Sequence, residues 1–358
     1  MNPFTYDQLP ARIVFGAGRL AEVGAEVERL GGQRVMLISD WAATAPAASV
    51  ARQLGARLAV PWDEVAQHVP VELAERARSA ASESNIDCVV CIGGGSSTGL
   101  AKAIALSHSV PIVAVPTTYA GSEQTQIYGL TGGRHKQTGK NPIVQPKTVV
   151  YDPELTLGLP SQVTGPSAFN ALAHSVEALY APGNNPITLA LALEGVRAIN
   201  ESLPTVMANP GDVEARGRLL YGAYLSGVAL GTTSTGLHHK LCHVLGGRFN
   251  LVHADTHSVI LPHAVAFNAP ALPTGMARLA EALGVPGRDP AGALWDLATA
   301  SNVPTRLADL HGHDGLVQRD DLPGAAHAAA EEITVNPRPV TEADLLGILE
   351  RAYEGVRP

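Results

Sequence analysis

The sequence has few cysteines, no long hydrophobic run and no excess of positive charge, and each lack excludes a class of protein. Three cysteines among 358 residues do not make a disulfide framework, which indicates a reducing compartment such as the cytoplasm. A membrane-spanning helix is not expected, because no run of about eighteen apolar residues is present. A formal net charge of -8 without a basic cluster argues against nucleic acid as a partner. The first residues also lack the basic region and apolar core of a signal peptide.

Two of the cysteines, Cys88 and Cys91, have the spacing of a redox motif but lie inside the apolar run 86–92. Residues three apart on a strand point to opposite faces, so their thiols should not meet. We therefore expect both to be buried core residues.

The length favours two domains, and 46% hydrophobic with 16% charged residues is typical of a globular chain. Up to residue 157, apolar runs alternate with helical patterns. Strands are expected at 34–39, 87–92, 111–115 and 148–151, and helices at 18–30, 71–84 and 98–107. Continuously apolar strands are typical of a parallel sheet covered on both faces. The pattern predicts an α/β, Rossmann-like dinucleotide-binding domain at 1–157.

Residues 158–358 have a different texture, with helical spacing and few strand candidates. Helices are expected at 166–180, 188–202, 212–230, 275–283 and 341–350. Thr341 is a plausible N-cap for the last of them. The second domain is predicted to be all-helical.

A glycine-rich loop follows the strand that ends at Ile92 and opens a helix. Its residues are Gly93, Gly94, Gly95, Ser96 and Ser97. Glycines allow close approach of a pyrophosphate, and the N–H groups of a helix start favour its negative charge. The loop matches neither G-x-G-x-x-G nor a P-loop, and an ordinary strand-to-helix turn remains the alternative. We interpret it as a phosphate site.

Two other strand ends carry candidate cofactor ligands. Asp40 follows the strand 34–39, where an acid can bind the adenosine ribose and disfavour a 2′-phosphate. A turn or N-cap aspartate is the alternative. Thr117 and Thr118 follow the strand 111–115 at the same expected sheet edge. These residues predict NADH as the cofactor, with NADPH left open.

Histidines are concentrated in one stretch of twenty residues. They are His238, His239, His243, His253 and His257. His239 and His243 are four apart and share one face of a helix, as Asn170 and His174 do upstream. Such clustering indicates a functional site. We expect packing or supporting roles for His238 and His257, and a structural role for His263.

The chain resembles the iron-containing (group III) alcohol dehydrogenase family over essentially its whole length. The matching elements are Phe15-Gly-Ala-Gly18, Gly93-Gly-Gly-Ser96, Pro116-Thr-Thr118, Gly121-Ser-Glu123, Asn170-x-x-x-His174, His239-x-x-x-His243 and His253. The resemblance implies an active site in the cleft between a dinucleotide-binding and a helical domain. It also implies a metal held by one aspartate and three histidines, at the positions of Asn170, His174, His239 and His253.

Two departures from the family pattern matter. Asn170 replaces the aspartate, and Gly99 replaces an acid that usually follows the glycine-rich loop. A neutral amide removes the only anionic ligand, so divalent-metal affinity should fall steeply. Both departures resemble the maleylacetate reductase branch. Its members reduce the C=C bond of maleylacetate to 3-oxoadipate in bacterial aromatic degradation, with NADH or NADPH and without a catalytic metal.

The resemblance suggests roles for individual side chains. We expect His243 to be the main proton donor, His253 the next candidate, and His239 an orienting or carboxylate-binding residue. Asn170 and His174 are expected to bind substrate. Histidines freed from a metal could attract a dicarboxylate, some of them as cations.

The expected partner is therefore a small dicarboxylate, and the expected assembly is a homodimer, although the sequence leaves the oligomeric state open. Arg134, Lys136 and Lys140 could neutralise substrate carboxylates, or could lie in a solvated glycine-rich loop, which we favour. Three alternatives stay open: a metal-dependent alcohol or polyol dehydrogenase, a lyase of the dehydroquinate synthase type, and an NAD-binding protein without catalysis.

Overall fold

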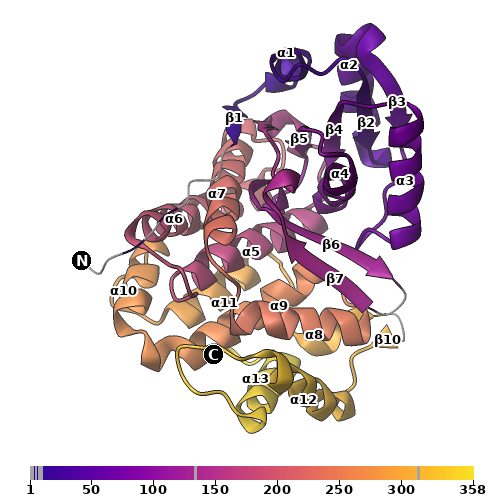
Figure 1. The fold of residues 1–358 in the computed structure, drawn as a ribbon. Helices are drawn as coiled ribbons and strands as arrows, with labels where there is room; N and C mark the ends of the chain where they lie inside the picture. The colour runs from indigo at the N-terminus through magenta and orange to yellow at the C-terminus, as the bar shows by residue number, and fades with distance from the viewer. Residues whose placement is uncertain (1–3, 5, 7–10, 133–134, 313–314) are drawn as a thin grey trace. The chain divides into compact units, whose positions relative to one another are not determined.

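The computed structural model describes Phe4, Tyr6 and residues 11–132, 135–312 and 315–358 (Figure 1). The chain divides into two compact units. We call the first the sheet unit; it comprises Asp7–Leu159 and Gly211–Leu220. Pro160–Pro210 and Tyr221–Pro358 make up most of the second, the helical unit. Among the described residues, no helix combines the length and the apolar character needed to span a membrane.

The sheet unit is built on six parallel strands in the order β1-β8-β5-β4-β2-β3. Their bounds are β1 Arg12–Phe15, β2 Val35–Ser39, β3 Leu58–Trp62, β4 Cys88–Gly93, β5 Ile112–Pro116 and β8 Thr148–Tyr151. The four strands expected from apolar runs are confirmed. The two that the sequence did not indicate, β1 and β3, lie at the sheet edges, where most of their residues are partly or fully exposed.

Helices cover both faces of this sheet. They are α1 Val23–Arg29, α2 Thr44–Leu54, α3 Val71–Glu83 and α4 Gly95–His108. Alternate residues such as Cys88 and Val90 pack with α1 and α2 in one core cluster. Cys91 lies on the other face, where Thr98 of α4 hydrogen-bonds its thiol. The two thiols are free, buried and on opposite faces, as expected.

The glycine-rich segment after β5 is not the solvated loop we expected. It forms an antiparallel hairpin of β6 (Ile127–Gly132) and β7 (His135–Lys140). Backbone pairing across six residue pairs satisfies the N–H and C=O groups that a loop would leave to water. Arg134 lies outside the described residues, and Lys140 lies at the end of β7.

The helical unit contains α5 Ser161–Ala178, α6 Pro186–Ala208, α8 Leu237–Phe249, α9 His253–Asn268, α10 Pro273–Ala282, α11 Pro290–Ala300, α12 Leu322–Glu332 and α13 Glu342–Glu354. Helix α7, Val213–Thr232, contributes its first residues to the sheet unit. A two-residue antiparallel pair, β9 (His311–Gly312) with β10 (Gly315–Leu316), is an exception to the expected all-helical content. Thr341 caps α13 in a capping box with Asp344, as expected for an N-cap.

Helix α5 is the centre of the helical unit. Every residue from Thr164 to Ala178 is buried, and the helix packs on α6, α8 and α9. Helices α8 and α9 pack side by side against α12 and α13 around a common apolar core. The histidines of α5, α8 and α9 are thus carried by helices that pack closely on one another.

Candidate functional site

The expected cofactor loops meet at the carboxyl edge of the parallel sheet. β4 pairs with β2 on one side and with β5 on the other, with Ser39 opposite Ile92 and Gly93 opposite Pro116. The Thr117 N–H donates to the Gly93 carbonyl at 3.0 Å. Since ligands of such folds bind at this edge, β2, β4 and β5 place the three segments where a dinucleotide would be held.

The first two glycines of the turn leave little room for a side chain. Gly93 has φ 144°, and a Cβ there would lie 2.7 Å from Asp40 Oδ2. A Cβ at Gly94 would lie 3.2 Å from the Thr118 methyl group. Helix α4 begins directly afterwards at Gly95, so its first N–H groups open toward the turn. The sequence thus forms a backbone cradle at a helix start, which suits a phosphate anion.

Two hydroxyls beside this turn are buried without a hydrogen-bond partner in the described part of the chain. They belong to Ser97, in the first turn of α4, and Ser122, in the loop after β5. A buried hydroxyl without a partner is costly, and a bound ligand would satisfy it. We expected a cofactor role for Ser97; Ser122 adds a second candidate on the neighbouring loop.

Asp40 serves as an N-cap, the alternative that the sequence left open. Its Oδ1 accepts from the N–H groups of Ala42 and Ala43 at 3.0 and 3.1 Å, at the start of the short 3-10 helix Trp41–Ala43. Its Oδ2 faces Gly93. Capping therefore engages one carboxylate oxygen and leaves the other directed at the glycine-rich turn, so the cap and a ribose-binding role are compatible.

Lys102 fixes the loop after β5. Its Nζ is buried and donates to the carbonyls of Ser122, Thr125 and Ile127 at 2.7 to 2.8 Å. Burial lowers the pKa of Lys102 to about 7, against the opposing effect of Glu123. This buried amine ties α4 to the segment that carries Ser122.

The histidine cluster is assembled by α5, α8 and α9 of the helical unit. Helix α5 contributes Asn170 and His174, and the His174 ring stacks on that of His239 with centroids 5.1 Å apart. The i, i+4 pairs inferred from the sequence therefore lie on helices, as expected. Helix α9 begins at His253 and adds His257 one turn later.

Glu177 is a buried acid at the centre of this cluster that the sequence analysis did not single out. It lies three residues after His174 on α5 and is 1% exposed. His239 Nδ1 lies 2.5 Å from Oε2, which also accepts from the Gly236 N–H. Burial by itself would raise the pKa of Glu177, but His239 and these hydrogen bonds lower it to about 2. Its spacing from Asn170 and His174 is the signal that could have revealed it.

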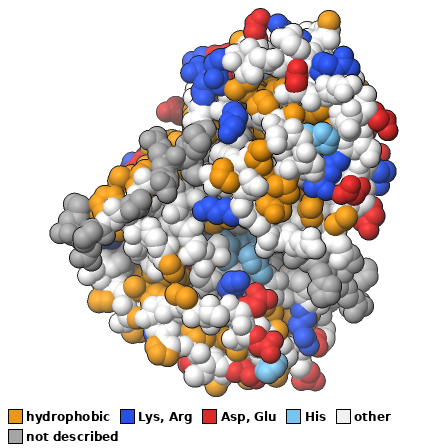
Figure 2. Space-filling model, in the orientation of Figure 1, with side chains coloured by type: hydrophobic (Ala, Val, Ile, Leu, Met, Phe, Trp, Pro, Cys, Tyr) orange, Lys and Arg blue, Asp and Glu red, His pale blue; other side chains and the backbone are white. Residues whose placement is uncertain are grey.

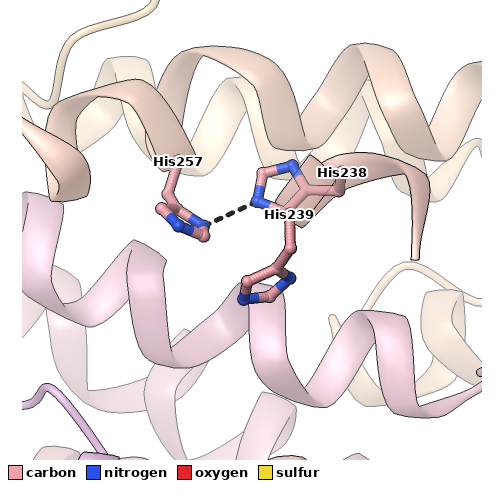
Figure 3. A group of neighbouring side chains, drawn as sticks. All are labelled: His238, His239 and His257. Atoms are coloured by element: carbon pink, nitrogen blue, oxygen red, sulfur yellow. Dashed lines mark hydrogen bonds between the residues drawn. The ribbon is translucent and has the colours of Figure 1, made fainter. Parts of the chain in front are cut away.

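A chain of hydrogen-bonded imidazoles runs from α8 to α9. His238 Nε2 contacts His257 Nδ1 at 2.7 Å (Figure 3). His257 Nε2 in turn contacts His253 Nε2 at 3.0 Å. His238 and His257 are fully buried. Through His257 they contact His253, and a supporting role for both remains our prediction.

His243 and His253 form the accessible side of the cluster. Their rings stack with centroids 5.9 Å apart, His243 is exposed and His253 is half-buried. Histidine side chains reach the molecular surface in Figure 2. A proton donor must be reachable by substrate, and these two positions meet that condition.

Burial favours the neutral form of three histidines in the cluster, His174, His238 and His257. It lowers the pKa of His174 well below its usual value, and neighbouring histidines lower it further. The pKa of His238 falls to about 3 and that of His257 is also well below normal, again because of burial. The expectation of a cationic histidine is therefore not met at His174: it can bind an anion through a neutral N–H, but not through charge.

At the family's metal positions this chain carries three histidines and one amide. Among the described residues, the ring nitrogens that converge within 4.8 Å belong to His238, His239 and His257, of which only His239 stands at a position that the family uses. Two of these rings already hydrogen-bond each other. Asn170 supplies a neutral amide where a divalent ion is usually bound by a carboxylate. The neutral amide weakens this donor set for a divalent ion relative to a set with a carboxylate, and we assign no chemistry to a metal.

His263 and Gly99, both singled out in the sequence, lie outside the histidine cluster and the glycine-rich turn. His263 is buried in α9 with both ring nitrogens lacking a hydrogen bond in the described residues, and burial lowers its pKa to about 4. A Cβ at Gly99 would lie 2.8 Å from Val69 Cγ2, so Val69 occupies the space that an acid would need there.

Comparison with known proteins agrees with this architecture. Residues 10–153 match the model of iron-containing alcohol dehydrogenase, and residues 164–353 match the C-terminal model of the same family. A maleylacetate reductase of Burkholderia cepacia is 48% identical over 358 residues, covering 100% of both chains. One of Pseudomonas sp. strain P51 is 46% identical over 355 residues, covering 99% of both. The crystal structure of maleylacetate reductase from Agrobacterium tumefaciens superposes with a TM-score of 0.94 at 44% identity, covering 100% of both chains.

Both family models together span nearly the whole chain, and the sheet, the glycine-rich turn and the histidine helices lie within the matched residues. The chain therefore belongs to the iron-containing alcohol dehydrogenase family.

Proposed function

We propose that this chain is a maleylacetate reductase, which uses NAD(P)H to reduce the C=C bond of 2-maleylacetate to 3-oxoadipate in bacterial degradation of aromatic compounds. The observation that carries the proposal is its 46 to 48% identity, over essentially full length, to proteins of that name. Asn170, in place of the family's acid, supports the same reaction on chemical grounds.

The proposed reaction does not need a Lewis acid. The ketone of maleylacetate is conjugated to its double bond. Hydride from the reduced nicotinamide can add to the alkene carbon remote from the ketone, and the electron pair then moves to the ketone oxygen as an enolate. Hydrogen-bond donors stabilise such a delocalised anion, whereas an alcohol dehydrogenase must stabilise a localised alkoxide. Protonation of the other alkene carbon completes the reduction, with one NADH and one proton consumed.

We assign the proton transfer to His243, with His253 as the second candidate. Both are accessible, and His253 is supported by the imidazole chain through His257. Asn170 and His174 would bind a substrate carboxylate through neutral donors. His239, whose Nδ1 donates to Glu177, would face the substrate with Nε2, an acceptor in the neutral ring and a donor in the charged ring. Replacing an aspartate by Asn170 removes a negative charge that would repel the dicarboxylate.

For the cofactor, we propose that Gly93, Gly94, Gly95, Ser96 and Ser97 hold the pyrophosphate, with Thr117 and Thr118 beside them. Asp40 would bind the adenosine ribose through its Oδ2 and would favour NADH over NADPH by repelling a 2′-phosphate. This assignment is supported by the hydroxyls of Ser97 and Ser122, which are buried beside the turn and have no hydrogen-bond partner among the described residues.

We also propose that the enzyme works without a catalytic metal, as a cytoplasmic homodimer. The proposal that no catalytic metal is needed rests on Asn170, which replaces the family's carboxylate ligand by a neutral amide. The location rests on three free, buried cysteines, which a reducing compartment preserves. Sedimentation equilibrium would test the assembly.

The decisive assay follows NADH absorbance with maleylacetate, with and without EDTA, together with metal analysis of the purified protein. We expect one NADH oxidised per substrate and no effect of the chelator. Stoichiometric iron or zinc with loss of activity in EDTA would establish a metal-dependent dehydrogenase instead. No net NADH consumption with catalytic NAD would indicate a lyase, and complete inactivity would indicate a binding protein.

A further inference from the structure

The buried carboxylate of Glu177 accepts four hydrogen bonds, three of them from residues at the start of α8. Oε2 accepts from His239 Nδ1 at 2.5 Å and from the Gly236 N–H at 2.9 Å. Oε1 accepts from the His238 N–H at 2.8 Å and from the Tyr180 hydroxyl at 3.2 Å. Three of these four hydrogen bonds join α5 to the beginning of α8, and the fourth comes from Tyr180, just after α5.

These contacts determine which nitrogen of His239 can reach a ligand. Because Nδ1 donates to Glu177, Nδ1 carries a proton in both the neutral and the charged ring. Nε2 is left buried and without a partner in the described part of the chain. Nε2 is therefore the nitrogen available to substrate, and Glu177 sets both its direction and its protonation pattern.

The same carboxylate fixes the backbone that carries the ring. The N–H groups of Gly236 and His238 belong to the start of α8, and a helix start favours a negative charge. The approach is close, because a Cβ at Gly236 would lie 3.1 Å from Oε1. Ring and helix are thus oriented by one buried group.

We infer that Glu177 is a positioning residue for the reduction: it holds His239 with Nε2 directed at the substrate, acting through that ring and not on the substrate itself. The inference rests on the proposed function. A helix-capping role alone would explain the two backbone hydrogen bonds, but not the 2.5 Å contact with the side chain of His239.

Kinetics of four variants test this. Glu177→Gln should lower kcat by about ten- to a hundredfold, the usual effect of removing a group that orients a site histidine. Its Kd for NADH should not change, because the cofactor loops belong to the sheet unit. Tyr180→Phe is the matched control: it removes one hydrogen bond to the same carboxylate without affecting His239, and should retain kcat within about twofold.

A double-mutant cycle separates action through His239 from general disruption. In a His239→Gln background, Glu177→Gln should cause little further loss of kcat. Multiplicative losses in the double variant would overturn the inference, as would an equal loss in Tyr180→Phe.

A measurement on the unaltered protein keeps the test valid if Glu177→Gln fails to fold. In protein labelled with ¹⁵N-histidine, the signal that disappears in His239→Gln should show Nδ1 protonated. A ring protonated only at Nε2 would overturn the inference. If the unaltered enzyme does not oxidise NADH with maleylacetate, the proposed function fails, while this NMR result still tests the geometry independently.

Discussion

Helix α5 brings one amide and one carboxylate into the histidine cluster, Asn170 and Glu177, and they have opposite consequences at the residue scale. Glu177 is ionised, but both of its oxygens already accept hydrogen bonds from His239 and from the start of α8. Asn170 is buried and adds no charge. The cluster therefore presents imidazoles without an acid that could hold a divalent ion beside them.

Asn170→Asp should partly reverse this balance. The new carboxylate should raise affinity for a divalent ion by at least about tenfold and increase the KM for maleylacetate, since it repels the dicarboxylate. Calorimetry with Zn²⁺ and steady-state kinetics in EDTA measure the two effects separately. An unchanged KM with no metal uptake would contradict the charge argument.

His243→Ala should lower kcat by a factor on the order of 10²–10⁴ if His243 is the general acid. Its side chain is exposed, so the melting temperature should change little. Stopped-flow measurement of NADH oxidation reports the chemical step. If only KM changes, His243 is not the proton donor, and His253 becomes the candidate.

At the scale of secondary-structure elements, the carboxyl ends of β2, β4 and β5 carry the proposed cofactor contacts. These ends combine structural and binding roles in the same residues. Asp40 caps the helical segment after β2 while its second oxygen faces the turn after β4. Removing the Asp40 side chain would therefore change the helix cap and the proposed ribose contact at the same time.

Asp40→Asn separates them, because asparagine caps a helix about as well as aspartate but carries no charge. We expect kcat/KM for NADPH to rise relative to NADH by roughly tenfold, equivalent to about 1.4 kcal/mol of removed repulsion. The ratio of the two specificity constants measures this. Asp40→Ala is the comparison, and it should in addition lower thermal stability through loss of the cap. An unchanged ratio in Asp40→Asn would exclude a ribose role.

At the scale of the whole molecule, buried histidines make stability depend on pH. The pKa of His238 is lowered from 6.5 to about 3 and that of His263 to about 4, in each case mainly by burial. Between these values and 6.5, the unfolded chain binds protons that the folded chain does not. Stability is therefore complete above pH 6.5 and falls as the pH drops toward 4. Glu177 adds a further loss between pH 4.5 and about 2.

His263→Gln tests this linkage away from the site. Removing one such histidine should reduce the slope of unfolding free energy against pH by about 1.4 kcal/mol per pH unit between 4 and 6.5. Urea unfolding at a series of pH values gives the slope. Parallel slopes for the variant and the unaltered protein would show that His263 is already protonated in the folded state.

Periodicity and strand-end chemistry predicted much of the fold and part of the candidate site. The four apolar strands, the helix opened by the glycine-rich turn, the Thr341 cap and the helical placement of His239 and His243 follow from local rules. Three elements were not indicated by local patterns: β1 has only four residues, β3 contains Pro61, and α2 has few large apolar residues. The β6–β7 hairpin depends on pairing that its glycine-rich sequence does not reveal.

The sequence by itself determined the family, the two kinds of domain and the exchange of an acid for Asn170, because these reside in residue types at fixed spacings. The tertiary structure decided which histidines are neutral and which nitrogen of His239 is available. Those properties depend on burial and on partners far apart in the chain, such as Glu177 on α5 and His239 on α8. No local pattern encodes a hydrogen bond across 62 residues.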